Sequence, residues 1–411
     1  MSPRRPTLGL VVPSLHQGGG VPAVARFLVD TAERSGEWNL QIISLCMATD
    51  DPESTSLRRP SAWLRQPGVG TRAWRGRDIP HVGARWGELE FQRYRTRPAL
   101  RELIRRCDVL QVVAGSPAWA NAVIGAGVPV SLQVATLAQV ERRRLQQVSH
   151  GPLALWRRAM TAITARMDDH ALRHVDAVQV ENPWMLMHAR RVNEGRSAAD
   201  IRYAPPGVDA SVFSPHPERD PSSGHVLCVG RLDDPRKNIG LLLEAYVQLP
   251  QILQARHRLV LAGAGGPPPS FWARVKMLGL QNRVEFIHRP DQEELVSLYQ
   301  QAAIFAFPSD EEGLGVVVLE AMACAVPVVS TRSGGPDGIL SDGEDGRLVP
   351  LDDPRALAEA MMDVLSDPQL NSTMGRRARA TIERIYAKEV AGRAFVDVWN
   401  RLADRKKPCV G

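Results

Sequence analysis

The segment that most constrains the fold of this chain runs from Ala303 to Thr331 and predicts one strand–loop–helix–strand unit. Its first five residues are apolar and predict a buried strand, which ends at Pro308 because proline cannot donate a hydrogen bond to a sheet. Residues 310–315 are acidic and contain two glycines, which predicts a loop. Residues 316–325 predict a short helix with an apolar face, and residues 327–330 begin the next buried strand. Units of this kind predict an α/β fold with parallel strands.

Two glutamates of this unit, Glu312 in the loop and Glu320 in the helix, are eight positions apart. Gly313 and Gly315 let the backbone approach a ligand closely, and the first amides of a helix form a site for phosphate oxygens. A carboxylate accepts two hydrogen bonds from a vicinal diol, so a glutamate at each end of a bound anion suits a sugar–diphosphate–nucleoside. The alternative is a solvated acidic loop that precedes a core helix. The amides that open the helix belong to Gly315, Val316 and Val317.

The string from Phe307 to Thr331 resembles the E-x7-E segment of the retaining, GT-B-fold glycosyltransferases of the family 4, or group 1, class. The resemblance implies that Glu312 contacts the donor sugar and that Glu320 holds the ribose hydroxyls. The spacing of the two residues would not by itself assign these roles.

Arg231 and Lys237 bracket a loop between a predicted strand and a predicted helix. Two cations beside free helix amides suit a diphosphate leaving group, although a chance pair of cations near a helix is also common. The segment resembles the G-R-L…K-N motif of the same family, which implies that both residues clamp the diphosphate and stabilise the charge that develops as the sugar–phosphate bond breaks. The resemblance also implies donor contacts from Arg289, beside the nucleotide base, and from Gly313, Leu314, Gly315, Val316 and Val317.

Five buried strands are predicted in the first half of the chain, with helical segments between them, which favours a parallel sheet with right-handed crossovers. The first strand leads into residues 13–20, a loop with three glycines, and then into a helix. A strand, a glycine loop and a helix in this order form a cradle for a phosphate group, although a tight turn is the simpler interpretation. The family resemblance implies that Gly19 and Gly20 face the donor diphosphate. The predicted strands are residues 8–12, 40–45, 108–113, 128–134 and 177–180.

One departure from the family concerns the acceptor half of the site. Many members have a His at the end of the strand that matches residues 128–134, but this segment holds none. Gln133 and Thr136 are the candidates for a polar contact to the acceptor, and neither is a good general base. The missing His leaves open a donor-binding protein without transfer activity, and a nucleotide-sugar hydrolase or epimerase is a second alternative of the same fold. The absence of a G-x-G-x-x-G fingerprint after the first strand argues against a dinucleotide-binding oxidoreductase.

The sequence leaves the roles of two arginine-rich stretches undecided. Residues 48–106 are predicted to be less regular, and a variable insertion is slightly favoured over an acceptor-recognition surface. Residues 141–173 are helical and basic, with Arg142, Arg143 and Arg144 at their start. A solvated helix face is the favoured interpretation, and peripheral contact with an anionic membrane is the alternative.

The length of 411 residues supports two domains. A Pro/Gly connector at residues 203–209 places the boundary, so the expected domains are an acceptor-side domain at 1–206 and a nucleotide-sugar-binding domain at 207–388. The last helix, 389–411, is expected to cross back to the first domain, as the resemblance implies.

The composition excludes some functions. A net charge of +6 is compatible with anionic donors or lipid headgroups, and the lack of zinc-finger or RNA-binding motifs argues against nucleic acid. No apolar stretch approaches the roughly 20 residues of a membrane helix. Scattered cysteines predict free thiols, most of them in the core, in a reducing compartment, so a cytoplasmic location is expected, with the inner face of the membrane as a peripheral site. The cysteines are Cys46, Cys107, Cys228, Cys324 and Cys409.

The resemblance therefore implies a GT-B fold, in which two Rossmann-like domains with parallel sheets face each other across a cleft. It implies a retaining hexosyltransferase that moves a sugar from a nucleotide-diphosphate sugar to a hydroxyl of a sugar, lipid or small molecule. No cofactor is expected besides the donor, and no metal, because helix amides with Arg231 and Lys237 can take the charge-stabilising role that Mg²⁺ has in other folds.

Overall fold

The computed structural model describes most of the chain. Among the residues singled out above, Arg144 and Cys409 lie outside the described part, as do residues 145–150 of the basic stretch. The described residues are 4–13, 15, 19–47, 50–59, 61, 63–143, 151–195 and 200–406.

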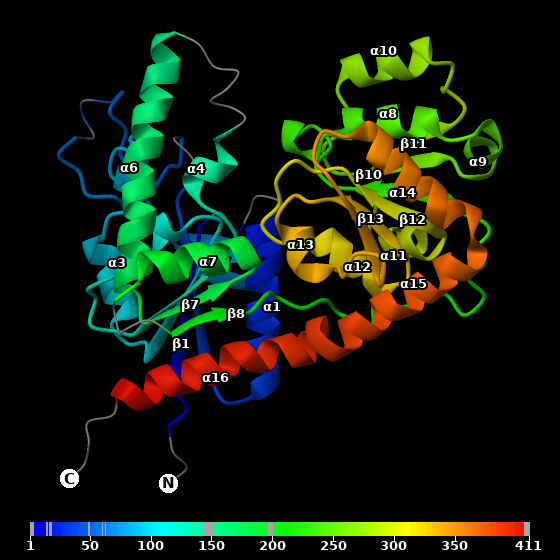
Figure 1. The fold of residues 1–411 in the computed structure, drawn as a ribbon. Coiled ribbons are helices and arrows are strands. Elements are labelled where there is room, and N and C mark those ends of the chain that lie inside the picture. The colour runs from blue at the N-terminus through cyan, green and yellow to red at the C-terminus, as the bar shows by residue number, and fades with distance from the viewer. Residues whose placement is uncertain are drawn as a thin grey trace. The chain divides into compact units, whose positions relative to one another are not determined.

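The chain divides into two compact units, Met1–Pro206 with Gly392–Gly411 and Gly207–Ala391. Each unit holds one mainly parallel sheet with helices packed against it, as the sequence predicts (Figure 1). The α/β fold class is therefore confirmed.

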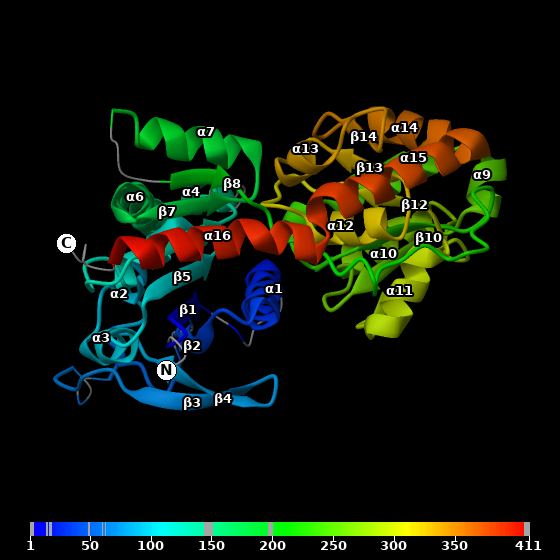
Figure 2. The same ribbon diagram turned by 90° about the horizontal axis from the view of Figure 1, so that it is seen from below.

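The sheet of the first unit has the strand order β3-β4-β2-β1-β5-β6-β7-β8, and every neighbouring pair except β3–β4 is parallel. Figure 2 shows β3 and β4 at one edge and β8 with α7 at the other. The central strands are buried along their whole length because helices cover both faces. The strands are β1 (Thr7–Pro13), β2 (Asn39–Leu45), β3 (Val69–Trp74), β4 (Arg77–Val82), β5 (Val109–Ala114), β6 (Val130–Val134), β7 (Ala177–Val180) and β8 (Asp200–Tyr203).

The hairpin β3–β4 corrects the expectation that residues 48–106 are less regular. Its strands pair in antiparallel register, with Trp74 opposite Arg77. Arg75 and Gly76 both have positive φ, as a two-residue turn of type I′ requires. An edge hairpin needs to bury only one face, so its strands can carry arginines. These arginines hide the alternation of apolar and polar residues by which a strand is recognised in a sequence.

Two short helices of the first unit, α2 (Glu90–Arg93) and α3 (Pro98–Ile104), lie in the stretch 48–106 that was expected to be less regular. Between β5 and β6 the chain forms a short 3₁₀ helix, η2 (Pro117–Ala122), and then passes through Gly125 and Gly127, both with positive φ. Glycine in this conformation ends a helix. The other helices are α1 (Gly20–Ser35), α4 (Ala138–Glu141), α6 (Pro152–His174) and α7 (Pro183–Val192).

The last helix, α16 (Lys388–Lys406), contributes its residues from Gly392 onward to the first unit. Phe395 packs on Phe27 with ring centroids 5.6 Å apart, and Trp399 packs on Trp38 at 6.2 Å. The indole nitrogen of Trp399 also donates to Gln111 Oε1 at 2.7 Å, which satisfies a polar group in the core. The apolar face of α16 is therefore buried against this unit.

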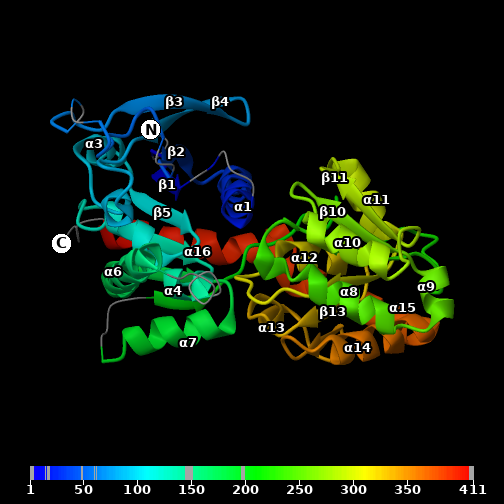
Figure 3. The ribbon, with the colours of Figure 1, turned by 90° about the horizontal axis from the view of Figure 1, so that it is seen from above.

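The sheet of the second unit has the order β11-β10-β9-β12-β13-β14 and is parallel throughout. Figure 3 shows β11 and α11 toward one side of this unit and α14 toward the other. The strands are β9 (His225–Val229), β10 (Leu259–Gly263), β11 (Val284–His288), β12 (Ala302–Phe307), β13 (Val328–Thr331) and β14 (Gly346–Val349).

In the second unit, α15 (Pro368–Thr381) is followed directly by a π-helical turn formed by residues Ile382–Tyr386. The described part of the second unit holds several helices. They are η3 (Pro235–Lys237), α8 (Ile239–Gln248), α9 (Gln251–Arg256), α10 (Pro269–Met277), α11 (Gln292–Gln300), α12 (Val316–Ala323), α13 (Gly335–Ile339), α14 (Pro354–Ser366) and α15 (Pro368–Thr381).

Candidate functional site

Three loops meet where β9, β12 and β13 end. The carboxyl ends of parallel strands lie at one edge of a sheet, which is where α/β folds bind their ligands. The loop after β12 is held on both sides by its backbone: Asp310 N donates to Arg236 O, and Glu312 N donates to Ser333 O, each at 2.8 Å. The loop that carries Glu312 is therefore fixed between the loops that follow β9 and β13.

Two glycines make this close packing sterically possible. Gly315 precedes α12 with φ of 86°, a conformation that strains other residues. At Gly335, an added Cβ would lie 2.3 Å from the carbonyl oxygen of Leu314. Helix α12 therefore begins directly after the loop of Glu312, as predicted, and its first amides are those of Val316 and Val317.

Glu312 and Lys237, which are 75 positions apart, form an ion pair through Lys237 Nζ and Glu312 Oε1. Ser309 Oγ donates to the same carboxylate oxygen at 3.0 Å. The ammonium group of Lys237 also lies 5.4 Å from the centre of the Phe307 ring. The structure thus brings together two of the three residues predicted to be catalytic and holds both side chains in defined positions.

Glu320 lies in the second turn of α12, and its Oε2 accepts a hydrogen bond from the hydroxyl of Tyr299 at 2.8 Å. Tyr299 is fully buried, and this burial, together with the nearby Glu320 carboxylate, raises the pKa of the tyrosine well above its usual value. The neutral hydroxyl therefore remains a donor that orients Glu320.

Arg231, the third predicted catalytic residue, is half-exposed, and its Nη2 lies 3.6 Å from Asp234 Oδ2. Asp234 is bound more closely by Arg236, whose Nη2 lies 2.8 Å away. Arg236, which the sequence did not single out, also approaches Glu311 at 3.6 Å. An arginine held by two carboxylates stabilises the loop, whereas Arg231 retains exposed guanidinium surface for an anion.

Arg289 follows β11, the edge strand two positions from β9 in the sheet. Its side chain is exposed, its φ is 51°, and its amide donates to Gly263 O at 2.9 Å. It therefore lies on the same carboxyl edge of the sheet as the other predicted donor residues.

The remaining predicted residues belong to the first unit. Gly19 is the N-cap of α1, with φ of 127°, and Gly20 is the first residue of that helix, with open space around the position of a Cβ. The loop residues 16–18 lie outside the described part of the chain. Gln133 and Thr136 are at and just after the end of β6, and both are buried.

Glu181, which sequence reasoning missed, is bound to Gln133. It follows β7 directly, is 4% exposed, and its carboxylate accepts a hydrogen bond from Gln133 Nε2. Burial raises the pKa of the Glu181 carboxyl to about 7, although the bond from Gln133 acts in the opposite direction. The signal in the sequence was an acidic residue directly after a buried strand, at the edge of the sheet where functional side chains gather.

A second buried acid, Asp168 of α6, accepts hydrogen bonds from the amides of Ala118 at 2.8 Å and Ala138 at 3.0 Å. Burial raises the pKa of Asp168 to about 7 as well. Because its oxygens bind the first turns of two short helices, its role is structural.

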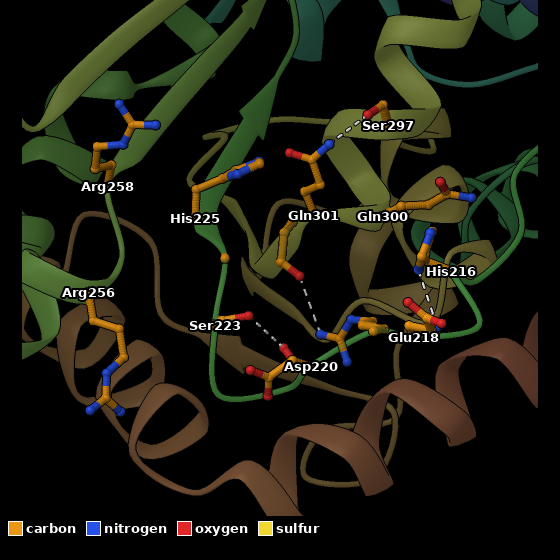
Figure 4. A pocket seen from close by; sticks show the side chains of 13 residues that line it. His216, Glu218, Asp220, Ser223, His225, Arg256, Arg258, Ser297, Gln300 and Gln301 are labelled. Atoms are coloured by element: carbon orange, nitrogen blue, oxygen red, sulfur yellow. Dashed lines mark hydrogen bonds between the residues drawn. The ribbon is translucent and has the colours of Figure 1, made fainter.

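A cavity of about 660 Å³ in the second unit lies at the opposite ends of the strands from Glu312 (Figure 4). It is lined by His225, which begins β9, and by Ala302, which begins β12. Figure 4 shows Arg256 and Arg258 pointing away from each other, so their charges do not converge on one ligand. Burial lowers the pKa of His225 to about 4, which keeps this side chain neutral. The cavity therefore has no evident part in the candidate site.

Within the described residues, no helix combines the length and apolar character that a membrane span requires.

Comparisons of sequence agree with the motifs. Residues 214–381 match the family described as Glycosyl transferases group 1. A GDP-mannose-dependent alpha-(1-6)-phosphatidylinositol monomannoside mannosyltransferase of Mycolicibacterium smegmatis is 32% identical over 275 residues, which cover 62% of this chain and 69% of that protein. A D-inositol 3-phosphate glycosyltransferase of Corynebacterium urealyticum is 32% identical over 51% of this chain. The matched region spans 54% of the length of that second relative.

Comparisons of structure support the two-domain GT-B fold. Sucrose-phosphate synthase from Thermosynechococcus elongatus aligns with a TM-score of 0.71 at 20% identity, covering 98% of this chain and all of that one. The HepE protein of Anabaena in complex with UDP-glucose aligns with a TM-score of 0.66 at 16% identity, covering 96% and 99% of the two chains. The expected fold is therefore confirmed, while the roles of the site residues stay predictions.

Proposed function

Because the chain belongs to the group 1 glycosyltransferases, we propose that it transfers a hexosyl group from a nucleotide-diphosphate sugar to an acceptor hydroxyl. We propose further that transfer retains the anomeric configuration and needs no metal ion at the donor site. The observation that carries the proposal is the pairing of Lys237 with Glu312 beside the first amides of α12.

The charge balance of this region supports a diphosphate leaving group. As the bond between sugar and phosphate breaks, negative charge develops on the diphosphate. The amides of Val316 and Val317, the ammonium group of Lys237 and the exposed guanidinium group of Arg231 would stabilise this charge from one edge of the sheet. These groups supply the role that a divalent cation has elsewhere, so the donor can bind without one.

Two carboxylates suit the two ends of the donor. Glu312 would accept hydrogen bonds from the hydroxyls of the sugar, and Glu320, oriented by Tyr299, would accept them from the ribose. Gln133 and Thr136 remain the proposed acceptor contacts, and Gly19 and Gly20 the proposed contacts of the first unit to the diphosphate. No cofactor is required besides the donor.

A thermal-shift panel tests the donor site. One nucleotide among GDP, UDP, ADP and dTDP, each in excess EDTA at about 100 times its dissociation constant, is expected to add about 2.7 kcal/mol of stability. GDP is the first to test, because the relative from M. smegmatis is named as GDP-mannose-dependent. A shift that appears only with Mg²⁺ would contradict metal independence, and the absence of any shift would contradict the donor site.

We propose that the basic segment 141–173 makes the peripheral membrane contact, at the inner face of the membrane, through the first turns of α6. Leu155 and Trp156 are 67% and 48% exposed there, and the neighbouring Arg157 and Arg158 are exposed as well. In Figure 1 these turns project away from the sheet of their own unit. Exposed apolar side chains flanked by cations suit the headgroup region of an anionic bilayer. Arg142 does not share this role, since it pairs with Glu90.

Vesicle binding tests this contact. The double variant Leu155→Ser with Trp156→Ser should lower the partition coefficient for phosphatidylserine-containing vesicles by at least about tenfold, because burying each apolar side chain contributes roughly 1.5–3 kcal/mol. The matched control is Ile252→Ser with Met277→Ser, which removes two exposed apolar side chains from the second unit. An equal loss of vesicle binding in both double variants would contradict the proposed contact. So would a wild-type chain that binds only vesicles of pure phosphatidylcholine.

A further inference from the structure

Three side chains with metal-ligating atoms converge at the carboxyl ends of β2 and β4, outside the candidate donor site. Cys46 directly follows β2, Asp51 lies in the loop after it, and His81 belongs to β4. One ligand atom of each lies within 4.8 Å of the other two. Cys46 is fully buried, and the side chains of His81 and Asp51 are 7% and 8% exposed.

Each of these side chains is held by a second hydrogen bond. Ser44 Oγ lies 2.9 Å from Nδ1 of His81, which directs Nε2 of the same ring toward Asp51. Asp51 Oδ1 accepts from the amide of Glu53 at 2.9 Å. Ser54 Oγ donates to the sulfur of Cys46 at 3.0 Å. Metal-binding side chains are typically oriented by such outer hydrogen bonds, with the second ring nitrogen of the histidine engaged.

We propose that Cys46, Asp51 and His81 form a binding site for a divalent transition-metal ion of the Zn²⁺ class. A thiolate, an imidazole and a carboxylate are the three ligand types that Zn²⁺ takes in proteins, whereas Ca²⁺ and Mg²⁺ take oxygen ligands. The ion replaces the proton of the Cys46 thiol and any proton on Nε2 of His81, so binding releases protons to solvent.

The geometry requires only a small adjustment. Ligands that lie about 2.0–2.3 Å from a tetrahedral ion are separated by roughly 3.3–3.8 Å, so the present 2.6 Å between His81 Nε2 and Asp51 Oδ2 must widen. Arg72 Nη2 lies 3.5 Å from the same carboxylate oxygen, and its side chain is 37% exposed and free to move toward solvent. Without an ion, Asp51 is paired with these two basic side chains instead.

The fourth coordination position has a route to solvent. Asp51 and Ser54 also line a cavity of about 450 Å³ in the first unit. A water molecule or a ligand atom can reach the ion from this cavity, as in zinc sites with three protein ligands. The ion would also link β2, the loop after it and the hairpin β3–β4, and would stabilise this edge of the sheet.

Cobalt titration tests the site. The untagged full-length chain, stripped with EDTA and dialysed, is titrated with Co²⁺ and followed by absorption. We expect about one Co²⁺ per chain, with a thiolate-to-cobalt charge-transfer band in the near ultraviolet and the visible bands of four-coordinate Co²⁺. Zn²⁺ should displace the cobalt and raise the melting temperature.

Matched variants assign the ligands. Cys46→Ser should abolish the charge-transfer band and weaken Co²⁺ binding at least about tenfold. His81→Gln should weaken binding to the same degree, which keeps the test informative if Cys46→Ser does not fold. The control is Cys107→Ser, another buried cysteine of the same unit, which should retain the band. Failure of the wild-type chain to bind Co²⁺, or equal binding by the Cys46→Ser chain, would overturn the proposal.

Discussion

Glu312→Gln is expected to lower kcat for sugar transfer by about a hundredfold to a thousandfold, which is the loss caused by removing a group that stabilises charge in a transition state. The glutamine keeps the shape of the side chain but removes the negative charge that pairs with Lys237. The sugar hydroxyls then lose a charged acceptor, and Lys237 loses the partner that positions it. The measurement is the initial rate of transfer from the nucleotide sugar identified by the thermal-shift panel.

Glu311→Gln is the matched control, because it changes the neighbouring glutamate in the same loop. Its contact with Arg236 is long, at 3.6 Å, and Arg236 keeps its closer contact to Asp234. The rate should stay close to that of the wild type, since Glu311→Gln leaves the pair of Lys237 with Glu312 in place. An unchanged rate in the Glu312→Gln chain would remove Glu312 from the mechanism. Donor hydrolysis without transfer in the wild-type chain would favour the hydrolase alternative.

The buried carboxyl of Glu181 is expected to make the first unit less stable as the pH rises. Its pKa is about 7 in the folded chain and about 4.3 in the unfolded chain, where it is solvated. Between these values the folded state binds the proton and the unfolded state does not, so stability falls as the pH rises from about 4.3 to 7. At roughly 1.4 kcal/mol for each pKa unit, the loss is about 3–4 kcal/mol.

Glu181→Gln removes this titration. The fall in unfolding free energy from pH 5 to pH 8 should therefore be about 3 kcal/mol smaller in the variant than in the wild type. Other buried groups, including Asp168, also titrate, so the quantity to compare is the difference between the variant and the wild type. Urea unfolding at the two pH values measures it. Glu194→Gln, at an exposed position of the same unit, serves as the control. A wild-type pH dependence retained in the Glu181→Gln chain would show that the Glu181 carboxyl is ionised when folded.

Local pattern in the sequence was enough to predict most helices and strands. Buried parallel strands appear as short apolar runs, and helices begin at recognisable residues, as Asn182 does by accepting from the amide of Met185 at 2.9 Å. Glu312 and Glu320 were also singled out from the sequence, because they lie on one loop–helix segment that resembles the E-x7-E motif, and their roles stay predictions.

Tertiary structure alone decided which distant side chains meet. The pairing of Lys237 with Glu312, the burial of Glu181 against Gln133 and the convergence of Asp51 with His81 each join residues that lie on different strands of a sheet or in the segments after them. Sequence pattern carries the period of a strand or helix but not the order of strands, and that order determines which loops are neighbours. The raised pKa of Glu181 has the same origin, because burial is a property of the packed unit and not of the residue type.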